Sequence, residues 1–470
     1  MSSRASFRAV LIMTLVAMLV TGGVASAQEP PLDLEALLEL ARSTNPGYAA
    51  AERSVDGAEY QQDAAESRRW PTVSVEGSFS YLFDPPEAVE FELNPADLIN
   101  PALLPPGPVE TETVTLLPEG DPIQYSLSVT LEQPILTWGR VPTGVRLAEV
   151  GVEAARLSKQ RAGDRLAAEI ETLYYSLYYA EQIKREVDEQ ARFAEQMVTN
   201  MRGSLESGAI TESQFRGFVV RLAETELGLV ELETQITGTL ARLRALTGGT
   251  ELVLGDFSFA EILLDSPTQP VARDAGTLIP IARENSVELA LLESRSSAAE
   301  LELRLANAER ILRPNLALQA RVRMTGSAFE FGGQGFGEGL EVSPVVTLGI
   351  EATVFDGGRA RAAVLEEEVD LEQARLERLE AELELEQVVR ERLATLRLAA
   401  ARTAQAESEV REAALLVSER ERELSRGAGS ENALLEQQLA YHALRAAWLQ
   451  QRLSYRRNLI ELELIVGVAL

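Results

Sequence analysis

The sequence predicts a mainly α-helical fold with a β-barrel portion that crosses a membrane, built from an internal duplication. Three observations support this prediction: a sequence pattern that recurs along the chain, two very long segments of helical periodicity, and four short segments in which apolar and polar residues alternate. Among the 470 residues, 46% are hydrophobic and only 6% are aromatic. A composition dominated by Ala, Leu, Glu and Arg favours long helices and coiled coils.

The duplication is clearest in two pairs of segments. Leu131–Arg140 (LEQPILTWGR) resembles Ile350–Arg359 (IEATVFDGGR), and the same offset places Gly208–Glu212 on Gly427–Glu431. A pattern that recurs in one register without a gap indicates two copies of one structural unit.

The duplication therefore divides the mature chain into a first repeat at residues 28–248 and a second repeat at residues 276–470. Residues 249–275 contain Gly, Pro and Asp and are interpreted as a connector. In each repeat we expect a helix, a strand, a loop, a strand, a very long helix, a tight turn and a helix.

The N-terminus has the features of a secretory signal peptide at residues 1–27. Arg4 and Arg8 precede the apolar stretch Val10–Val20, and Ala25–Ala27 is a cleavage site of the A-x-A type. The alternative is an uncleaved anchor, but the apolar run is short for a helix that must span a membrane with about 20 residues. No other segment has the length and apolarity of such a helix, so any membrane portion must consist of strands.

Charge and residue usage exclude several functional classes. The formal net charge is −29, which makes the chain a poor partner for nucleic acid. The chain contains no Cys, and His442 is its one His. These counts argue against a metal site and against a nucleophilic triad. We therefore expect no cofactor and no enzymatic activity.

Two segments have the heptad pattern of long coiled-coil helices, at Pro142–Leu205 and Arg359–Arg426. In the first segment, residues spaced alternately three and four positions apart form one seam along the helix, and all of them are apolar except Lys184. The equivalent positions of the second segment, 219 residues later, form a seam that is also mostly apolar. Some 65 helical residues extend for roughly 100 Å. A rod of that length requires other helices beside it.

Four segments of about nine residues alternate between apolar and polar side chains, as membrane strands do. They cover residues 72–81, 123–132, 316–324 and 345–352. The same alternation also fits a half-buried sheet of a soluble domain, so that alternative stays open. The loops favour the membrane: Asp84–Pro122 contains nine acids and no Lys or Arg, and Gly326–Gly339 is rich in Gly. Because four strands cannot close a barrel, several chains must contribute.

These features together resemble the outer membrane efflux protein family, the TolC-like exit ducts. The resemblance rests on Asn45-Pro46, which follows an amphipathic first helix, and on motifs that occur in both repeats: Leu131–Leu136 and Trp138–Arg140 with Phe355–Arg359, and Gly208–Thr211 with Gly427–Ser430. It implies a homotrimer whose twelve strands close one β-barrel in the outer membrane lipid, continued by a long periplasmic α-helical barrel. The implied function is passive export from a periplasmic assembly to the exterior, as in tripartite efflux or type I secretion.

The resemblance also implies where partners bind. The two tight turns would form the periplasmic tip, where related ducts meet an adaptor protein of the membrane-fusion type and, through it, an inner-membrane pump. The expected contact residues are Gly208, Ala209, Ile210, Thr211, Gly427, Ala428, Gly429 and Ser430.

The tip sequences also predict local structure. Gly208 and Gly427 are suited to positive φ, and Thr211 and Ser430 to capping the helices that follow. Relatives usually carry Asp six residues after the tip glycine, whereas this chain has Gln214 and Ala433.

Carboxylates near the second turn are candidates for a gate. Glu412, Glu419 and Glu423 could ring a narrow pore and favour cations. The alternative is a solvated helix face with ordinary Glu–Arg pairs, for example between Glu419 and Arg422.

Three smaller features also allow structural interpretations. Gly357-Gly358 lacks the spacing of a nucleotide loop and is interpreted as a strand-to-helix bend. Trp70 and Trp138 could be membrane-interface aromatics or packing residues at the junction of strands and helices. The competing hypothesis for the whole chain is a non-conducting periplasmic coiled-coil scaffold.

Overall fold

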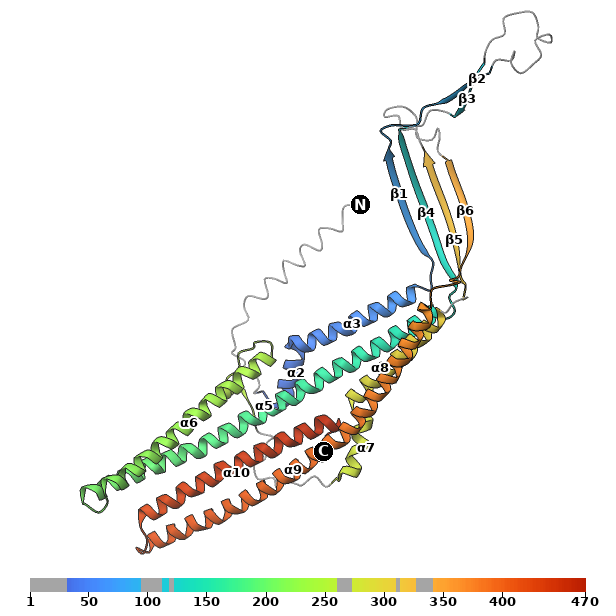
Figure 1. Ribbon diagram of the computed structural model, residues 1–470. Coiled ribbons are helices and arrows are strands. Elements are labelled where there is room, and N and C mark those ends of the chain that lie inside the picture. The colour runs from blue at the N-terminus through green and yellow to red at the C-terminus, as the bar shows by residue number, and fades with distance from the viewer. Residues whose placement is uncertain (1–31, 94–111, 118–121, 260–272, 310–312, 327–340) are drawn as a thin grey trace, which may run out of the picture.

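The computed structural model is elongated, with a β-sheet at one end and long helices that run away from it (Figure 1). The predicted signal peptide and most of the Gly-rich loop lie outside the described residues. The structure describes residues 32–93, 112–117, 122–259, 273–309, 313–326 and 341–470.

Two helices of 67 residues each form the body of the molecule, α5 (Arg140–Glu206) and α9 (Arg359–Ser425). At 1.5 Å per residue each is about 100 Å long. The apolar positions of the predicted heptad seam are buried or half-buried in both helices, so the prediction of two long coiled-coil helices is confirmed.

Four shorter helices lie against these two. α3 (Pro46–Ser67) and α6 (Glu212–Leu246) follow each other along α5, while α8 (Val287–Ala308) and α10 (Glu431–Val466) contact both α5 and α9 (Figure 1). Each long helix is therefore covered by two shorter helices placed end to end.

The single helix expected before the strands of each repeat is in fact two helices. α2 (Leu34–Thr44) precedes α3, and α7 (Ala275–Asn285) precedes α8. Asn45 has extended backbone and its side chain caps α3, where Pro46 occupies the first turn. Ser286 caps α8 in the same way. The cap residues therefore end one helix and start the next.

Glycines let the shorter helices meet end to end. Gly248 follows α6 with φ +67°, and a Cβ there would lie 2.8 Å from the carbonyl oxygen of Thr44. Gly467 follows α10 with φ +76°, and its Cβ would lie 2.8 Å from Cβ of Asn285. Both positions need a residue without a side chain, for steric and for conformational reasons.

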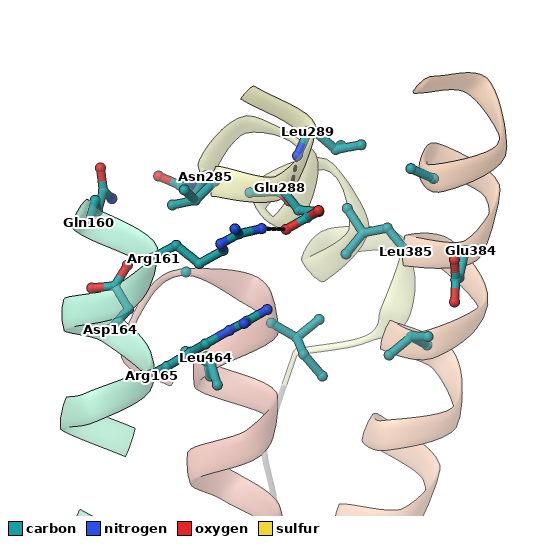
Figure 2. A pocket seen from close by; sticks show the side chains of 16 residues that line it. Gln160, Arg161, Asp164, Arg165, Asn285, Glu288, Leu289, Glu384, Leu385 and Leu464 are labelled. Carbon is teal, nitrogen blue, oxygen red and sulfur yellow. Dashed lines mark hydrogen bonds and ion pairs between the residues drawn. The ribbon is translucent and has the colours of Figure 1, made fainter. Parts of the chain in front are cut away.

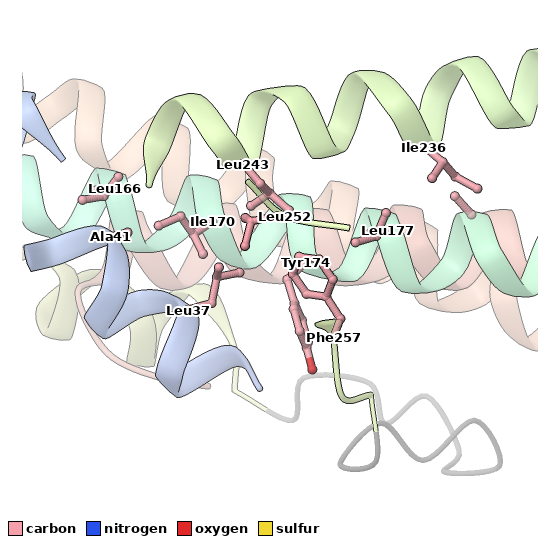
Figure 3. Packing of buried hydrophobic residues seen from close by; sticks show 11 residues of the cluster. Leu37, Ala41, Leu166, Ile170, Tyr174, Leu177, Ile236, Leu243, Leu252 and Phe257 are labelled. Carbon is pink, nitrogen blue, oxygen red and sulfur yellow. The ribbon is translucent and has the colours of Figure 1, made fainter. Parts of the chain in front are cut away.

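The main core of the first repeat lies where α2 and the start of the connector meet the long helix (Figure 3). Leu252 and Phe257 come from residues 249–275, so the first part of the predicted connector is packed structure. The buried members of this core are Leu37, Ala41, Leu166, Ile170, Tyr174, Leu177, Ala180, Ile236, Leu243, Leu252 and Phe257.

The four predicted strands form one antiparallel sheet in the order β1-β4-β5-β6. β1 (Thr72–Tyr81) has the predicted bounds, and β5 (Asn315–Gly326) nearly so. β4 (Ile123–Leu136) is longer than predicted, and β6 (Glu341–Glu351) begins earlier. The prediction of four strands in this part of the chain is confirmed.

A second, two-stranded ribbon was not predicted. β2 (Val89–Leu93) and β3 (Glu112–Leu117) pair with each other beyond the far end of the sheet, within the segment expected to be a loop (Figure 1). Val89, Phe91 and Leu93 alternate with Glu90 and Glu92, a short strand signal among prolines that the sequence interpretation missed.

Among the described helices, none combines the length and the apolar character needed to cross a membrane.

Candidate functional site

The two outer strands of the sheet have free edges among the described residues, because β1 pairs with β4 alone and β6 with β5 alone. Every side chain of β1 is exposed, and so is every one in β6 except Ser343. The exposed set includes large apolar residues such as Val75, Val346 and Ile350. A long, apolar sheet with two free edges is unsatisfied as a monomer in water.

Exposed aromatic residues lie at both ends of this sheet. Trp70 and Phe355 lie at the helical end and are 73% and 84% exposed, while Tyr81 and Phe83 lie at the other end. The 10 residues of β1 extend for about 33 Å, close to the hydrocarbon thickness of a bilayer. Aromatic residues at both rims of such a strand are typical of membrane β-barrels.

The two tryptophans weighed above differ in environment. The Trp138 indole N–H donates to the carbonyl oxygen of Pro314 at 2.9 Å, and the guanidinium of Arg313 lies 5.7 Å from the ring centroid. Trp138 therefore makes packing contacts at the junction of strands and helices, although 42% of it stays exposed. Trp70 remains exposed, as the membrane-interface interpretation requires.

The chain turns from strand to long helix through two consecutive left-handed residues in each repeat. These are Trp138 (φ +51°) and Gly139 (φ +86°) before α5, and Gly357 (φ +71°) and Gly358 (φ +93°) before α9. The interpretation of Gly357-Gly358 as a strand-to-helix bend is confirmed.

In the second repeat a carboxylate supports this bend. Asp356 accepts hydrogen bonds from the backbone N–H of Gly358 at 2.9 Å and of Ala360 at 2.7 Å. These bonds, more than the nearby charge of Arg359, lower the pKa of Asp356 below its usual value. The first repeat has no side-chain cap at the start of α5.

The tight turns at the far ends of the helices have the predicted backbone. Gly208 and Gly427 both have φ +73°, which confirms their conformational role. In each turn the residue after the glycine donates its N–H to a carbonyl oxygen five positions earlier, at 2.8 Å in the first turn and 3.0 Å in the second. This is the Schellman pattern that ends a helix.

The first turn has side-chain support. Thr211 caps α6, and with Gln214 it forms a capping box in which the Thr211 N–H donates to Oε1 of Gln214 at 2.9 Å. The departure from Asp at position 214 therefore leaves the turn hydrogen-bonded. Ile210 and Phe215 pack on a cluster that includes Phe193 of α5.

The second turn lacks this support. Ser430 is the N-cap residue of α10, as predicted, but its side chain makes no capping hydrogen bond. Ala433, at the position equivalent to Gln214, has no group to offer. A Cβ at Gly429 would lie 2.9 Å from the backbone nitrogen of Leu424, so this turn also depends on a small residue.

The three candidate gate acids lie on α9 near the second turn. Glu412 and Glu419 are exposed, whereas Glu423 is half-buried and pairs with Arg420 at 2.6 Å. Arg422 donates to the carbonyl oxygen of Ser418 and not to Glu419. The ion pair between Glu419 and Arg422 that the sequence suggested is therefore wrong. A gating role for the three acids stays a prediction.

The seam between α5 and α10 contains half-buried ion pairs that the sequence could not reveal. Glu186 of α5 contacts Nδ1 of His442 at 2.7 Å and Nε of Arg445 at 3.2 Å. Farther along, Glu171 pairs with Arg456 at 2.6 Å. The partners in each pair are more than 250 positions apart in the chain, so only the fold brings them together.

A cavity of about 440 Å³ lies where α8 begins and α10 ends (Figure 2). Arg161 of α5 pairs across it with Glu288 of α8 at 2.8 Å. None of the residues predicted to form a functional site lines it, and we interpret it as a gap at the helix junction. Among the described residues there is no group of three metal-ligating side chains.

The chain matches the family model described as outer membrane efflux protein over residues 37–249 and 278–468. This match covers most of the sequence, and the chain belongs to the outer membrane efflux protein family. The family is one of outer-membrane channels, and the predicted fold, a β-barrel portion joined to an α-helical barrel, is confirmed.

Solved structures of outer-membrane channels have the same fold. CusC, studied for transmembrane channel formation, is 16% identical with a TM-score of 0.71, and the alignment covers 93% of this chain and 92% of CusC. The outer-membrane channel OprN is 18% identical with a TM-score of 0.70, covering 92% and 89%. CmeC of Campylobacter jejuni is 14% identical with a TM-score of 0.69, covering 92% and 85%. No curated protein matches the chain by sequence.

Proposed function

We propose that three copies of this chain form a continuous exit duct, with a closed β-barrel in the outer membrane and a helical tube in the periplasm. The free edges of β1 and β6 support this proposal most directly. In lipid every backbone N–H and C=O needs a partner, so a four-stranded sheet must pair both edges with neighbouring subunits. Twelve strands in all would close the barrel.

The helices support the same assembly. Apolar side chains stay exposed on α6 and on α9, including Val220 and Leu227 on α6 and Leu376, Leu379 and Leu383 on α9. The spacing of the α9 residues is that of a coiled-coil seam. We infer that α9 of one subunit packs against α3 and α6 of the next, which would close a tube.

Such a duct would conduct passively, and its energy would come from partners. We propose that the two turns, at residues 208–211 and 427–430, form the periplasmic tip that binds an adaptor protein connected to an inner-membrane pump. Both turns lie at the far end of the molecule from the sheet (Figure 1), and a side chain added at Gly208 or Gly427 would meet open space.

Disulfide cross-linking in the outer membrane tests the trimeric barrel, because the chain has no Cys of its own. Ser74→Cys in β1 is combined with a Cys at position 345, 347 or 349 of β6. At least one combination should produce covalent dimers and trimers on a denaturing gel. Ser128→Cys in β4, combined with the same β6 variants, is the matched control and should give monomers. Monomers from every β1 combination would contradict the closed barrel.

A double substitution tests the tip. Gly208→Arg with Gly427→Arg should abolish export in cells while trimers still form. Gly203→Arg, within the last turns of α5 and also free of contacts, is the control and should retain export. Unchanged export in the double variant would rule out docking at these turns.

The alternative, a non-conducting periplasmic scaffold, makes a different prediction. A scaffold would fractionate as a soluble monomer, whereas a duct is extracted from membranes by detergent as a heat-modifiable trimer. The exposed apolar sheet favours the duct.

A further inference from the structure

Basic residues are distributed around the sheet in a way that the duct itself does not require. Residues 70–139, which include β1 to β4 and their loops, contain no Lys or Arg, and residues 324–358 contain none either. Within the sheet, β5 carries the two arginines Arg321 and Arg323, and Arg321 donates to Oγ1 of Thr130 at 3.2 Å. A larger group lies where the strands meet the helices, at Arg68, Arg69, Arg140, Arg313, Arg359 and Arg361.

These six arginines gather at one end of the sheet because all four strands join their helices there (Figure 1). We call this group the arginine collar. The acids at the same end are Glu66, Glu309, Glu351 and Asp356, so arginines outnumber carboxylates in a chain whose net charge is −29. The opposite end of the sheet carries acids and, in the stretches just named, no base.

Two members of the collar have structural partners. Arg140 lies 3.5 Å from Glu309, and Arg313 lies over the Trp138 ring. Arg68, Arg69, Arg359 and Arg361 are exposed, and none has a side-chain ion pair or hydrogen bond among the described residues. Asp356, the acid nearest to Arg359, already accepts two backbone hydrogen bonds. Four guanidinium groups per subunit are thus available for an anion.

We propose that the arginine collar binds the phosphates of anionic phospholipids in the periplasmic leaflet and so fixes the depth and orientation of the barrel. The proposal rests on the membrane placement of the sheet. The collar lies just beyond the exposed apolar strands, beside the exposed Trp70 and Phe355, at the depth expected for lipid headgroups. Guanidinium is planar and pairs with phosphate through two hydrogen bonds, and its stem can stay in an apolar environment.

Purified trimers added to vesicles test the collar. The variant is Arg68→Gln, Arg69→Gln, Arg359→Gln and Arg361→Gln together. The control, Arg216→Gln, Arg221→Gln, Arg402→Gln and Arg411→Gln, removes the same charge from the distant helices. Each protein is offered to vesicles of phosphatidylcholine alone and to vesicles containing 30% phosphatidylglycerol, and the inserted fraction is measured by flotation and protease protection.

Each basic residue at an anionic surface contributes a factor of about five to partitioning. Wild type and control should insert at least ~10-fold better into the anionic vesicles at low salt, and this preference should shrink in ~0.5 M KCl. The collar variant should form trimers and insert into neutral vesicles as wild type does, without the anionic preference. Equal insertion of wild type into both kinds of vesicle would contradict lipid binding by the arginine collar. A preference of the collar variant for anionic vesicles would contradict it as well. Failure of wild type to insert into either vesicle would instead overturn the proposed duct.

Discussion

The two repeats share a backbone and differ in the side chains that hold it. The turns at Gly208 and Gly427 have the same φ and the same hydrogen-bond pattern. The first turn is fixed by the capping box of Thr211 and Gln214, whereas the second has Ser430 without a cap bond.

At the other end of the long helices, next to the sheet, it is the second repeat that has the side-chain hydrogen bonds at the helix start. There the first repeat relies on Trp138, a tryptophan with positive φ whose indole N–H is hydrogen-bonded. The second repeat uses two glycines and the carboxylate of Asp356, which accepts backbone N–H groups at the start of α9. The duplication has therefore preserved the turn geometry, and each copy stabilises it with different side chains. The copy with fewer side-chain contacts at its tip, the α9–α10 hairpin, should open more easily there.

The largest expected effect concerns the seam that joins the repeats. Glu186→Ala should lower the opening free energy of α10 near His442 by about 2 kcal/mol, because a half-buried Arg445 would lose its carboxylate. Glu407→Gln removes an exposed partner of Arg411 and should cost less than about 0.5 kcal/mol. Hydrogen exchange of α10 and α9 amides measures both. Equal costs would contradict a seam held by half-buried ion pairs.

Next in size is the strain at the shared glycines. Gly208→Val and Gly427→Val should each lower the local opening free energy by about 1–2 kcal/mol, because a β-branched residue is disfavoured at φ +73°. The two losses should be similar, since both sites have open space around them. Hydrogen exchange in the adjoining helical turns reports each loss, and a clearly larger loss at one site would contradict equal backbone strain at the two glycines.

A smaller effect is expected at the N-cap residues, where the two turns should differ clearly. Thr211→Ala should cost about 1 kcal/mol at the start of α6, the usual effect of removing a working cap. Ser430→Ala should change the start of α10 very little, because its side chain makes no cap bond. Exchange protection of the first α6 and α10 amides measures both changes. A comparable loss at Ser430 would contradict the difference between the turns.

The smallest effect concerns pH. The folded protein lowers the pKa of Asp356, so the cap contributes fully above the ordinary Asp pKa of about 3.9 and is lost as pH falls below it. Protection at the start of α9 should therefore stay constant from about pH 6 to about pH 4 and drop as the pH falls further, after correction for intrinsic exchange. The start of α5, which has no carboxylate cap, is the control. The variant Asp356→Asn should lack the pH dependence.

Periodicity was enough to predict the long helices and the four strands of the sheet. A long run of heptads is compatible with few structures besides a helix, and strict alternation with few besides a strand. The helix starts at Asn45 and Ser286 were missed although a cap residue was present at each. β2 and β3 were missed because they are only five and six residues long and lie among prolines and acids.

The tip turns were predictable because glycine at a helix end has a specific conformational meaning. The behaviour of Ser430 was not, since its side-chain geometry depends on the surrounding turn. The contact of Glu186 with His442 and Arg445 depends on packing between distant helices, which a single sequence does not specify.

The central claim is that one face of the sheet meets lipid and the other meets water, and thiol accessibility along β1 tests it most directly. Single Cys residues at positions 73 to 79 of this Cys-free chain are exposed in intact outer membranes to a water-soluble maleimide. The account predicts alternation, with fast labelling at Ser74, Glu76 and Ser78 and slow labelling at Val73, Val75 and Phe79. Uniformly fast labelling would mean that the strand has no lipid-facing side, and would contradict the duct.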